Sequence, residues 1–204
     1  MKKQIFSLSV ILLLLPVFLT ASQRVTVDRS KYNAISVLDQ LNRSYNFIVH
    51  TIVSLPNGKE RFKQFETYKD IMVWDTHLVS QKKNFKNLKI DDLTAGTFLT
   101  NIEDDISSIK PKLTKPEALK IVHDCPNNHT DGDKTTEPGD VQNVKVELII
   151  KEFGGTTAKL VYMVNYMVEE PAPSRPYYVI DANTGALLEK WEGLPSFNKD
   201  EMFE

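Results

Sequence analysis

The spacing at which apolar residues recur changes several times along the chain. From Arg29 to Tyr45 apolar residues recur at helical spacing, which predicts a first helix. The β-branched run from Phe47 to Leu55 then predicts a strand, and Pro56-Asn57-Gly58 after it predicts a tight turn. Two further strands of this half are expected between Glu60 and Val79, broken near Lys69-Asp70, and one more from Leu93 to Thr100.

The second half begins with a helix signal. Thr114-Lys115-Pro116-Glu117 fits a capping box, in which the threonine bonds the Glu117 amide and the glutamate bonds back. Two pairs of alternating segments then predict two strand hairpins. The first pair is Lys145–Glu152 with Lys159–Glu169 around Gly154-Gly155, and the second is Tyr177–Ile180 with Ala186–Trp191 around Asp181 to Gly185.

These elements predict an α+β fold of two small units, each with one helix packed on a curved antiparallel sheet. The first unit covers residues 23–110 and the second residues 111–194, with a connector from Ile102 to Lys112. The last residues, 195–204, have no periodicity and are expected to form an irregular tail. Because the turns at Pro56-Asn57-Gly58, at Gly154-Gly155 and from Asp181 to Gly185 have hairpin chemistry, no parallel β-α-β crossover is expected.

The first 22 residues have the pattern of a secretory signal peptide. Lys2 and Lys3 precede an apolar run from Ile5 to Leu19, and Thr20-Ala21-Ser22 supplies small residues suited to cleavage. The alternative is a membrane anchor, but the run is shorter than the roughly 20 residues that a spanning helix needs. The pattern therefore predicts a secreted or periplasmic protein, with no stable membrane insertion after cleavage.

The composition is that of an ordinary globular protein. The 204 residues include 25 Lys and Arg against 27 Asp and Glu, a formal net charge of -2. With 41% hydrophobic and 25% charged residues, the chain is neither wholly disordered nor fibrous. The near-neutral charge gives no reason to expect a nucleic-acid partner. The single cysteine, Cys125, excludes an internal disulfide framework.

No recognised catalytic motif is found in the sequence. It contains no His-Glu-x-x-His pair, no Gly-x-Ser-x-Gly elbow and no Gly-rich phosphate loop. One polar stretch carries possible zinc ligands, although its spacing matches no known closed zinc site and an exposed loop is the simpler interpretation. We therefore expect no catalytic residue, no metal and no cofactor. The members of that stretch are His123, Asp124, Cys125, His129, Asp131 and Asp133.

Two segments of the first half resemble the fungalysin/thermolysin propeptide domain. The first is Arg61-Phe-Lys-Gln64-Phe-Glu-Thr-Tyr68-Lys-Asp-Ile71-Met-Val73-Trp74, and the second is Leu93-Thr-Ala-Gly96-Thr-Phe-Leu. That family has an Arg, a Gln and an aromatic residue before a Gly-Ile-Pro-Val-Trp-Gly strand. This chain departs from the pattern at three positions, where Asp70, Met72 and Asp75 replace Gly, Pro and Gly.

The second half resembles a PepSY domain, and this match is the sharper one. It is carried by Leu113-Thr-Lys-Pro-Glu-Ala-Leu119, by Lys159-Leu-Val-Tyr162 and by the long stretch from Arg175 to Leu194, which contains Asp181-Ala-Asn-Thr-Gly185 and Trp191-Glu-Gly193. Together the two resemblances cover most of residues 30–194, in the order found in pro-regions of thermolysin-like zinc metalloproteases. They imply that the two units are cystatin-like and PepSY-like.

The resemblance implies a binding function rather than catalysis. In that family the pro-region packs on the catalytic domain, and its C-terminal end enters the active-site cleft. This chain would then be a secreted inhibitor or folding chaperone of a thermolysin-like protease. Alternatively, it is the pro-region of a longer metalloendopeptidase precursor, or a secreted PepSY module of unknown ligand.

The implied site residues fall into two sets. Residues expected to contact the protease are Gly193, Leu194, Pro195, Phe197, Met202 and Phe203. Motif residues expected to have structural roles are Arg61, Gln64, Tyr68, Val73, Trp74, Gly96, Tyr162, Asp181, Gly185 and Trp191.

Overall fold

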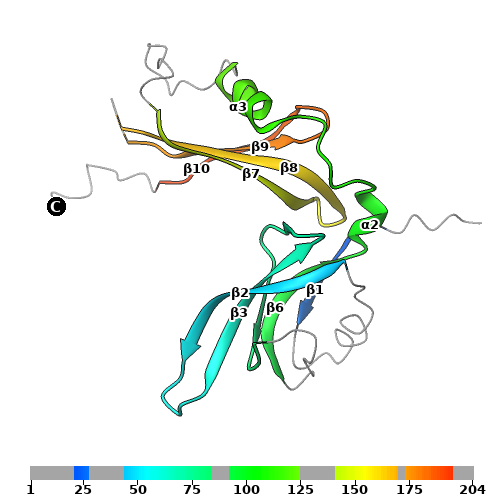
Figure 1. Ribbon diagram of the computed structural model, residues 1–204, viewed down its shortest axis with the longest axis vertical. Helices are drawn as coiled ribbons and strands as arrows, with labels where there is room; N and C mark the ends of the chain where they lie inside the picture. The colour runs from blue at the N-terminus through cyan, green and yellow to red at the C-terminus, as the bar shows by residue number, and fades with distance from the viewer. Residues whose placement is uncertain (1–20, 28–43, 84–91, 125–140, 170–172, 195–204) are drawn as a thin grey trace, which may run out of the picture.

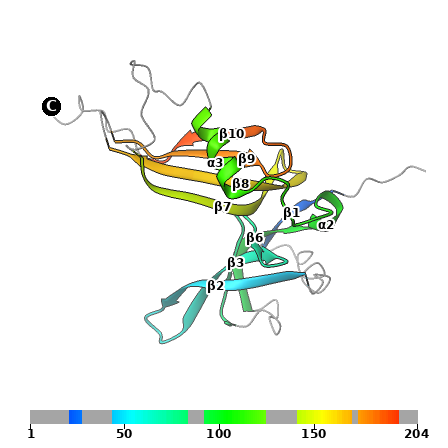
Figure 2. The ribbon, with the colours of Figure 1, turned by 45° about the horizontal axis from the view of Figure 1, so that its top comes forward.

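The computed structural model describes residues 21–27, 44–83, 92–124, 141–169 and 173–194. In these residues the chain forms two antiparallel sheets and few helices (Figures 1 and 2). The expected antiparallel pairing is confirmed, whereas a helix packed on a sheet is seen only in the second half. The predicted helix from Arg29 to Tyr45 lies outside the described residues except at its end. There Ser44 is in a turn and Tyr45 begins a strand, so the helix prediction is wrong at Tyr45.

The first sheet has six strands in the order β1-β6-β5-β3-β2, with the short β4 paired to β3. The break expected near Lys69-Asp70 is confirmed, because the chain reverses there between β3 and β4. The single strand expected after this break is wrong, because a turn at Trp74-Asp75 divides it into β4 and β5. Strand β1 was not predicted from the sequence. The strands are β1 (Gln23–Val27), β2 (Tyr45–Ser54), β3 (Glu60–Tyr68), β4 (Ile71–Met72), β5 (His77–Ser80) and β6 (Leu93–Thr100).

The second sheet is a four-stranded meander in the order β10-β9-β8-β7. Both predicted hairpins are confirmed, since β7 pairs antiparallel with β8, and β9 with β10. Helix α3 (Lys115–Asp124) covers the face of this sheet that points away from the first sheet (Figures 1 and 2). The strands are β7 (Val141–Phe153), β8 (Thr157–Val168), β9 (Pro176–Asp181) and β10 (Leu187–Glu192).

The capping box at the start of α3 forms as expected. The Thr114 amide and hydroxyl both donate to Glu117 Oε2 at 2.7 Å, and the Glu117 amide donates back to the Thr114 hydroxyl at 3.4 Å. These bonds satisfy amides that a helix start leaves without partners. The apolar face of the helix, with Ala118 and Val122 fully buried, packs on the second sheet.

The turn between β9 and β10 also follows its sequence signal. The Asp181 side chain accepts hydrogen bonds from the amides of Asn183 and Thr184 at 2.9 and 3.0 Å. The Gly185 amide closes the turn on the Asp181 carbonyl at 2.9 Å, with Gly185 at a φ of 76°. A carboxylate that bonds the amides two and three positions ahead is the usual Asx-turn device.

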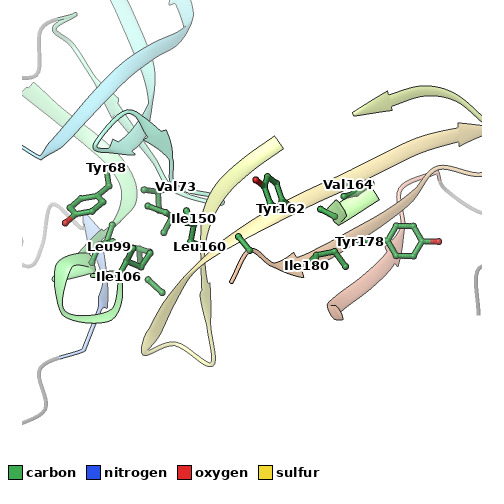
Figure 3. Close-up of a cluster of buried hydrophobic side chains, with 14 of the residues drawn as sticks. Tyr68, Val73, Leu99, Ile106, Ile150, Leu160, Tyr162, Val164, Tyr178 and Ile180 are labelled. Atoms are coloured by element: carbon green, nitrogen blue, oxygen red, sulfur yellow. The ribbon is translucent and has the colours of Figure 1, made fainter. Parts of the chain in front are cut away.

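The two sheets are joined by direct contacts. The amide of Trp74 donates to the Ile150 carbonyl at 2.7 Å, and Val73 forms a parallel bridge with Ile150. Arg24 on β1 forms an ion pair with Glu152 on β7 at 2.6 Å. Buried apolar side chains continue across this junction and under α3 as one cluster, part of which Figure 3 shows from Tyr68 to Tyr178.

Helix α2 (Ile102–Asp105) lies at the same junction, inside the segment that the sequence predicted as a connector. The hydroxyl of Tyr45 donates to Glu103 at 2.7 Å and accepts the amide of Ile102 at 2.8 Å. The strand position of Tyr45 thus places its side chain to hold the first turn of α2. The last residue of this helix, Asp105, bonds both β8 and the residue before β1.

Candidate functional site

The chain leaves the second sheet after β10, where the resemblance placed the protease contact. Gly193 and Leu194 are described, whereas Pro195, Phe197, Met202 and Phe203 lie outside the described residues. We define the exit surface as the side chains and backbone of Arg175, Tyr177, Trp191, Glu192, Gly193 and Leu194.

The exit surface is built on a pair of stacked aromatic rings. The rings of Tyr177 and Trp191 lie 5.2 Å apart between centroids and are nearly parallel, with an interplanar angle of 7°. The Arg175 guanidinium lies 5.8 Å from the centre of the Tyr177 ring and also donates to the Asn165 side chain at 3.2 Å. Both aromatic side chains are half-buried, so Arg175, Tyr177 and Trp191 form a partly exposed stack of one cation and two rings.

The backbone beyond β10 is held by one carboxylate. Glu192 Oε1 accepts the amide of Arg175 at 2.6 Å and the amide of Leu194 at 2.9 Å. The amide of Gly193 donates to the Arg175 carbonyl at 2.9 Å. These bonds hold the backbone of Gly193 and Leu194 against the strand that begins after Arg175.

Gly193 is required here by close approach rather than by an unusual backbone angle. A Cβ atom at this position would lie 2.3 Å from Cε2 of the Tyr177 ring and 2.9 Å from the Arg175 carbonyl oxygen. We predict that Gly193→Ala lowers the free energy of unfolding by about 1–3 kcal/mol, the usual cost of overpacking, because the Tyr177 ring must leave Trp191.

Chemical denaturation followed by near-ultraviolet circular dichroism checks this prediction. Tyr177→Leu removes the ring, so Gly193→Ala in that background should cost clearly less than in the natural chain. Equal costs in the two backgrounds would contradict the proposed contact.

Three motif residues of the first half lie on β3. Gln64 is fully buried on β3 and donates to the Ser80 hydroxyl at 2.7 Å and to the Lys82 carbonyl at 3.1 Å. Arg61 is half-buried on the same strand. Tyr68 packs edge-to-face on Tyr45, with ring centroids 5.1 Å apart. None of these residues is part of the exit surface.

Trp74 is different, because it packs against the second sheet. Trp74 from the first sheet and Trp191 from β10 pack against the same small apolar cluster, on the face of the second sheet opposite α3. Nothing in the sequence indicates that the two tryptophans share one face. The buried members of that cluster are Ile149, Val161, Met163 and Val179.

The other motif residues of the second half hold the helix and the turn. The hydroxyl of Tyr162 donates to the Leu113 carbonyl at 2.8 Å, just before α3. Gly185 lies under the same helix, since a Cβ there would meet Ile121 Cδ1 at 3.0 Å. Asp181 forms the turn described above and lies 3.8 Å from the Lys159 ammonium.

Sequence reasoning missed the buried acid Glu66 on β3. Its carboxyl is fully buried and accepts the amide of Leu99 at 2.9 Å. Burial raises the pKa of Glu66 to about 8, although the Leu99 amide, the Thr76 hydroxyl and the Arg24 charge each lower it. The carboxyl is therefore mostly protonated at neutral pH.

The described residues contain no group of three His, Cys, Asp or Glu side chains that could hold a metal. Of the candidate zinc ligands, only His123 and Asp124 fall in the described ranges, and the His123 ring stacks on Tyr166 at 6.1 Å. Within those ranges, no helix has both the length and the apolar character that crossing a membrane requires.

Three proteases from Vibrio species are similar to this chain. The "Neutral protease" of Vibrio proteolyticus is 30% identical over 142 residues, which are 70% of this chain and 22% of that protein. The "Hemagglutinin/proteinase" of Vibrio cholerae is 27% identical over 180 residues, 86% of this chain and 28% of that protein. The "Virulence metalloprotease" of Vibrio anguillarum is 30% identical over 152 residues, 72% of this chain and 23% of that protein.

The chain thus spans only about a quarter of the length of the curated relatives it matches. No family model matches it.

Proposed function

We propose that this chain is a pro-region of the kind found in thermolysin-like zinc metalloproteases, and that it binds a catalytic domain of that class. The observation that carries the proposal is the pattern of similarity. Most of this chain matches three proteases, yet each match takes up only 22–28% of the protease. A module that accompanies the catalytic domain explains this pattern without any catalytic residue in the chain itself.

In this proposal the exit surface and the tail after it make the contact with the protease. The Glu192 carboxylate and the Tyr177–Trp191 stack hold the last residues before the tail in place. The tail, residues 195–204, combines apolar anchors with charged residues. An extended segment can lie in a protease cleft and bond through its backbone, as strand addition does. A bound tail would block the substrate groove and would also favour the folded protease.

The proposal also includes export of the chain across the inner membrane. Residues 1–22 have the signal-peptide pattern, which would place the chain and its protease outside the inner membrane. The chain can act as part of one precursor with its protease or as a separate protein. The physical contact is the same in both cases, because the exit surface and the tail are the same residues in each.

The first test is inhibition in trans. The chain should inhibit casein hydrolysis by the Vibrio proteolyticus neutral protease, or by one of the other two proteases, and should hydrolyse no casein itself. If it slows none of the three and does not raise the refolding yield of any of them, the proposed function fails.

Deleting residues 195–204 tests the role of the tail. We expect the melting temperature to stay nearly unchanged, and the inhibition constant to rise tenfold or more, equivalent to about 1.4 kcal/mol and upward. The control replaces the tail by Gly and Ser residues of the same number, which keeps its length and removes its anchors. If the truncated chain inhibits as well as the full one, the contact must lie on the folded sheets instead.

A further inference from the structure

The backbone nitrogen of Ser22 is bound to a carboxylate. Ser22 is fully buried, and its N–H donates to Asp105 Oδ2 at 3.0 Å. The same oxygen accepts the amide of Ala158, at the start of β8, at 2.8 Å. Asp105 therefore connects three parts of the fold, namely the residue before β1, the end of α2 and the second sheet.

The acceptor of the Ser22 N–H is a carboxylate, which is a stronger hydrogen-bond acceptor than the carbonyl oxygen that usually accepts a backbone amide. Partial burial raises the pKa of Asp105, but the hydrogen bonds from Ser22 and Ala158 outweigh it and hold the pKa below its ordinary value of 3.8. A backbone N–H is commonly satisfied by a carbonyl oxygen. A carboxylate at the same place would bind a positively charged nitrogen more strongly, because both partners would then be ionised.

We propose that the leader is cut between Ala21 and Ser22, and that the new α-ammonium of Ser22 binds the Asp105 carboxylate. In the cut, a leader peptidase and one water hydrolyse the Ala21–Ser22 peptide bond. The hydroxyl goes to the Ala21 carbonyl carbon, and the nitrogen takes a proton to become an amine, which is protonated at neutral pH. The cut lies one residue earlier than the boundary at residue 22 that the sequence suggested.

The contacts that hold the Ser22 nitrogen beside Asp105 do not involve Ala21. β1 begins at Gln23, which pairs with Thr100 on β6. Arg24 then bonds Glu152 and the Asp75 carbonyl. Because these contacts lie after the cut, the Ser22 nitrogen stays beside Asp105 when the leader is gone. A cut after Ser22 would remove the donor, whereas a retained leader would keep it a neutral amide.

The sequence around the cut matches the pattern of leader peptidase sites at one of its two positions. Ala21 supplies the small residue immediately before the bond, whereas Leu19, the last apolar residue of the run, stands where the pattern has a second small residue. The leader is removed from the chain during export, so the burial of Ser22 in the folded protein does not prevent the cut. Folding would then bring the free end to Asp105.

The titration of the α-amine can be distinguished from that of the neighbouring lysines by its lower ordinary pKa. Asp105 lines a cavity of about 380 Å³ that is also lined by Lys110, Lys112, Lys159 and Asp181. Lysines ordinarily titrate near about 10.4, whereas an α-amine titrates near about 8. The other charged groups of the surrounding elements are Glu103 and Asp104 on α2, Arg24 on β1 and Glu152 on β7.

The first experiment identifies the new end. The full chain is exported with its own leader from a bacterial host, and the N-terminus of the purified protein is read by mass spectrometry. We expect Ser22 as the first residue. A chain that begins at any other residue, or that keeps its leader, overturns the proposal.

The second experiment measures the ion pair. The chain that begins at Ser22 is compared with its N-acetylated form, each with Asp105 or with Asp105→Asn, which keeps an acceptor oxygen for the Ala158 amide. At pH 6 we expect acetylation to lower the melting temperature by about 2–4 °C in the natural background, and by less than about 1 °C in the Asp105→Asn background. An equal effect in both backgrounds, or no effect in either, overturns the proposal.

The pH dependence provides a readout that does not need the Asp105 variant to fold. A partner carboxylate raises the α-amine pKa, so the added stability is fully present below about pH 8 and is lost as the pH rises through the raised value. The acetylated chain lacks this loss. An α-amine pKa at or below its ordinary value, measured by NMR titration, contradicts the ion pair. Neither experiment depends on whether the chain binds a protease.

Discussion

Glu66→Gln will raise the free energy of unfolding by several kcal/mol at pH 8 and will change it little at pH 4. The cause is the buried carboxyl of Glu66, whose pKa is raised to about 8 from an ordinary 4.5. Above pH 4.5 the unfolded chain releases this proton while the folded chain keeps it. The natural protein therefore loses stability as the pH rises from 4.5 to 8, and the loss levels off above 8.

The size of the effect follows from the pKa difference. Each pKa unit corresponds to about 1.4 kcal/mol, so the gain from Glu66→Gln is on the order of 4 kcal/mol at pH 8. Glutamine has the same shape, and its side-chain oxygen can accept the Leu99 amide without holding a proton. Urea denaturation at pH 4, 6 and 8 measures the difference. Glu60→Gln, an exposed position on the same strand, is the control and should show no such trend.

A difference between natural protein and Glu66→Gln that stays constant from pH 4 to pH 8 would contradict this account. It would mean that Glu66 is ionised in the folded protein and that a charge partner compensates its burial. Arg24 is the nearest candidate for that role, because its charge already lowers the pKa of Glu66.

Gly96→Ala will destabilise the first sheet by about 3–5 kcal/mol, which sums a backbone strain and an overpacking cost. Gly96 has a φ of 142°, a region that side chains rarely allow. A Cβ atom there would lie 2.1 Å from the His77 carbonyl oxygen and 2.8 Å from the Leu78 Cα. Both are backbone atoms of β5, so the substitution must push β5 and β6 apart.

Denaturation of the purified variant, or its failure to accumulate as folded protein, measures this cost. Gly58→Ala is a matched control, because Gly58 also has a positive φ, of 74°, but has no atom within 4 Å of its added Cβ. We expect it to cost about 1 kcal/mol, the penalty for the left-handed conformation alone. If Gly96→Ala costs no more than Gly58→Ala, the clash with β5 is not real.

The parts of the fold that could be predicted from the sequence have local causes. The start of α3 is set by a capping box within four residues, and the β9–β10 turn by Asp181 and Gly185. Strand β1 has no such signal, because it is five residues long and its partner β6 lies far along the chain. The small helix α2 depends on the Tyr45 hydroxyl, which also lies far away along the chain, so the sequence pattern did not predict this helix.

The inward face of β3 shows a second limit of prediction from the sequence, namely which side chains of a strand are buried. Phe62, Gln64, Glu66 and Tyr68 all point inward and are buried, so the alternation places two polar side chains inside and leaves Phe65 half-exposed. Hydrophobicity rules favour the opposite choice for Glu66 and Phe65. The strand cannot satisfy both, because neighbouring residues point to opposite faces.

Two of the three departures from the family pattern near β4 have a structural explanation. Asp70 and Asp75 stand where the propeptide family has glycine, and both have positive φ, of 68° and 59°. Aspartate tolerates this conformation better than most residues. Positive φ angles at Asp70 and Asp75 are what glycine at these two positions would allow, whereas the replacement of Pro by Met72 has no structural explanation here. For the candidate site, the sequence located the chain exit at Gly193 but could not reveal that Trp74 and Trp191 pack against the same apolar cluster of the second sheet.

The pairing of β1 also sets the order in which the protein can assemble. β1 emerges first, but its sheet partner β6 and its bonds to α2 come later, and the Arg24–Glu152 bond joins residues 128 positions apart. Contacts between distant residues form slowly, because a long loop must close first. The hairpins of the second half, by contrast, need only their own turns. The first strand to be synthesised is therefore among the last to be incorporated, and until then its backbone is open to chaperones and to other chains.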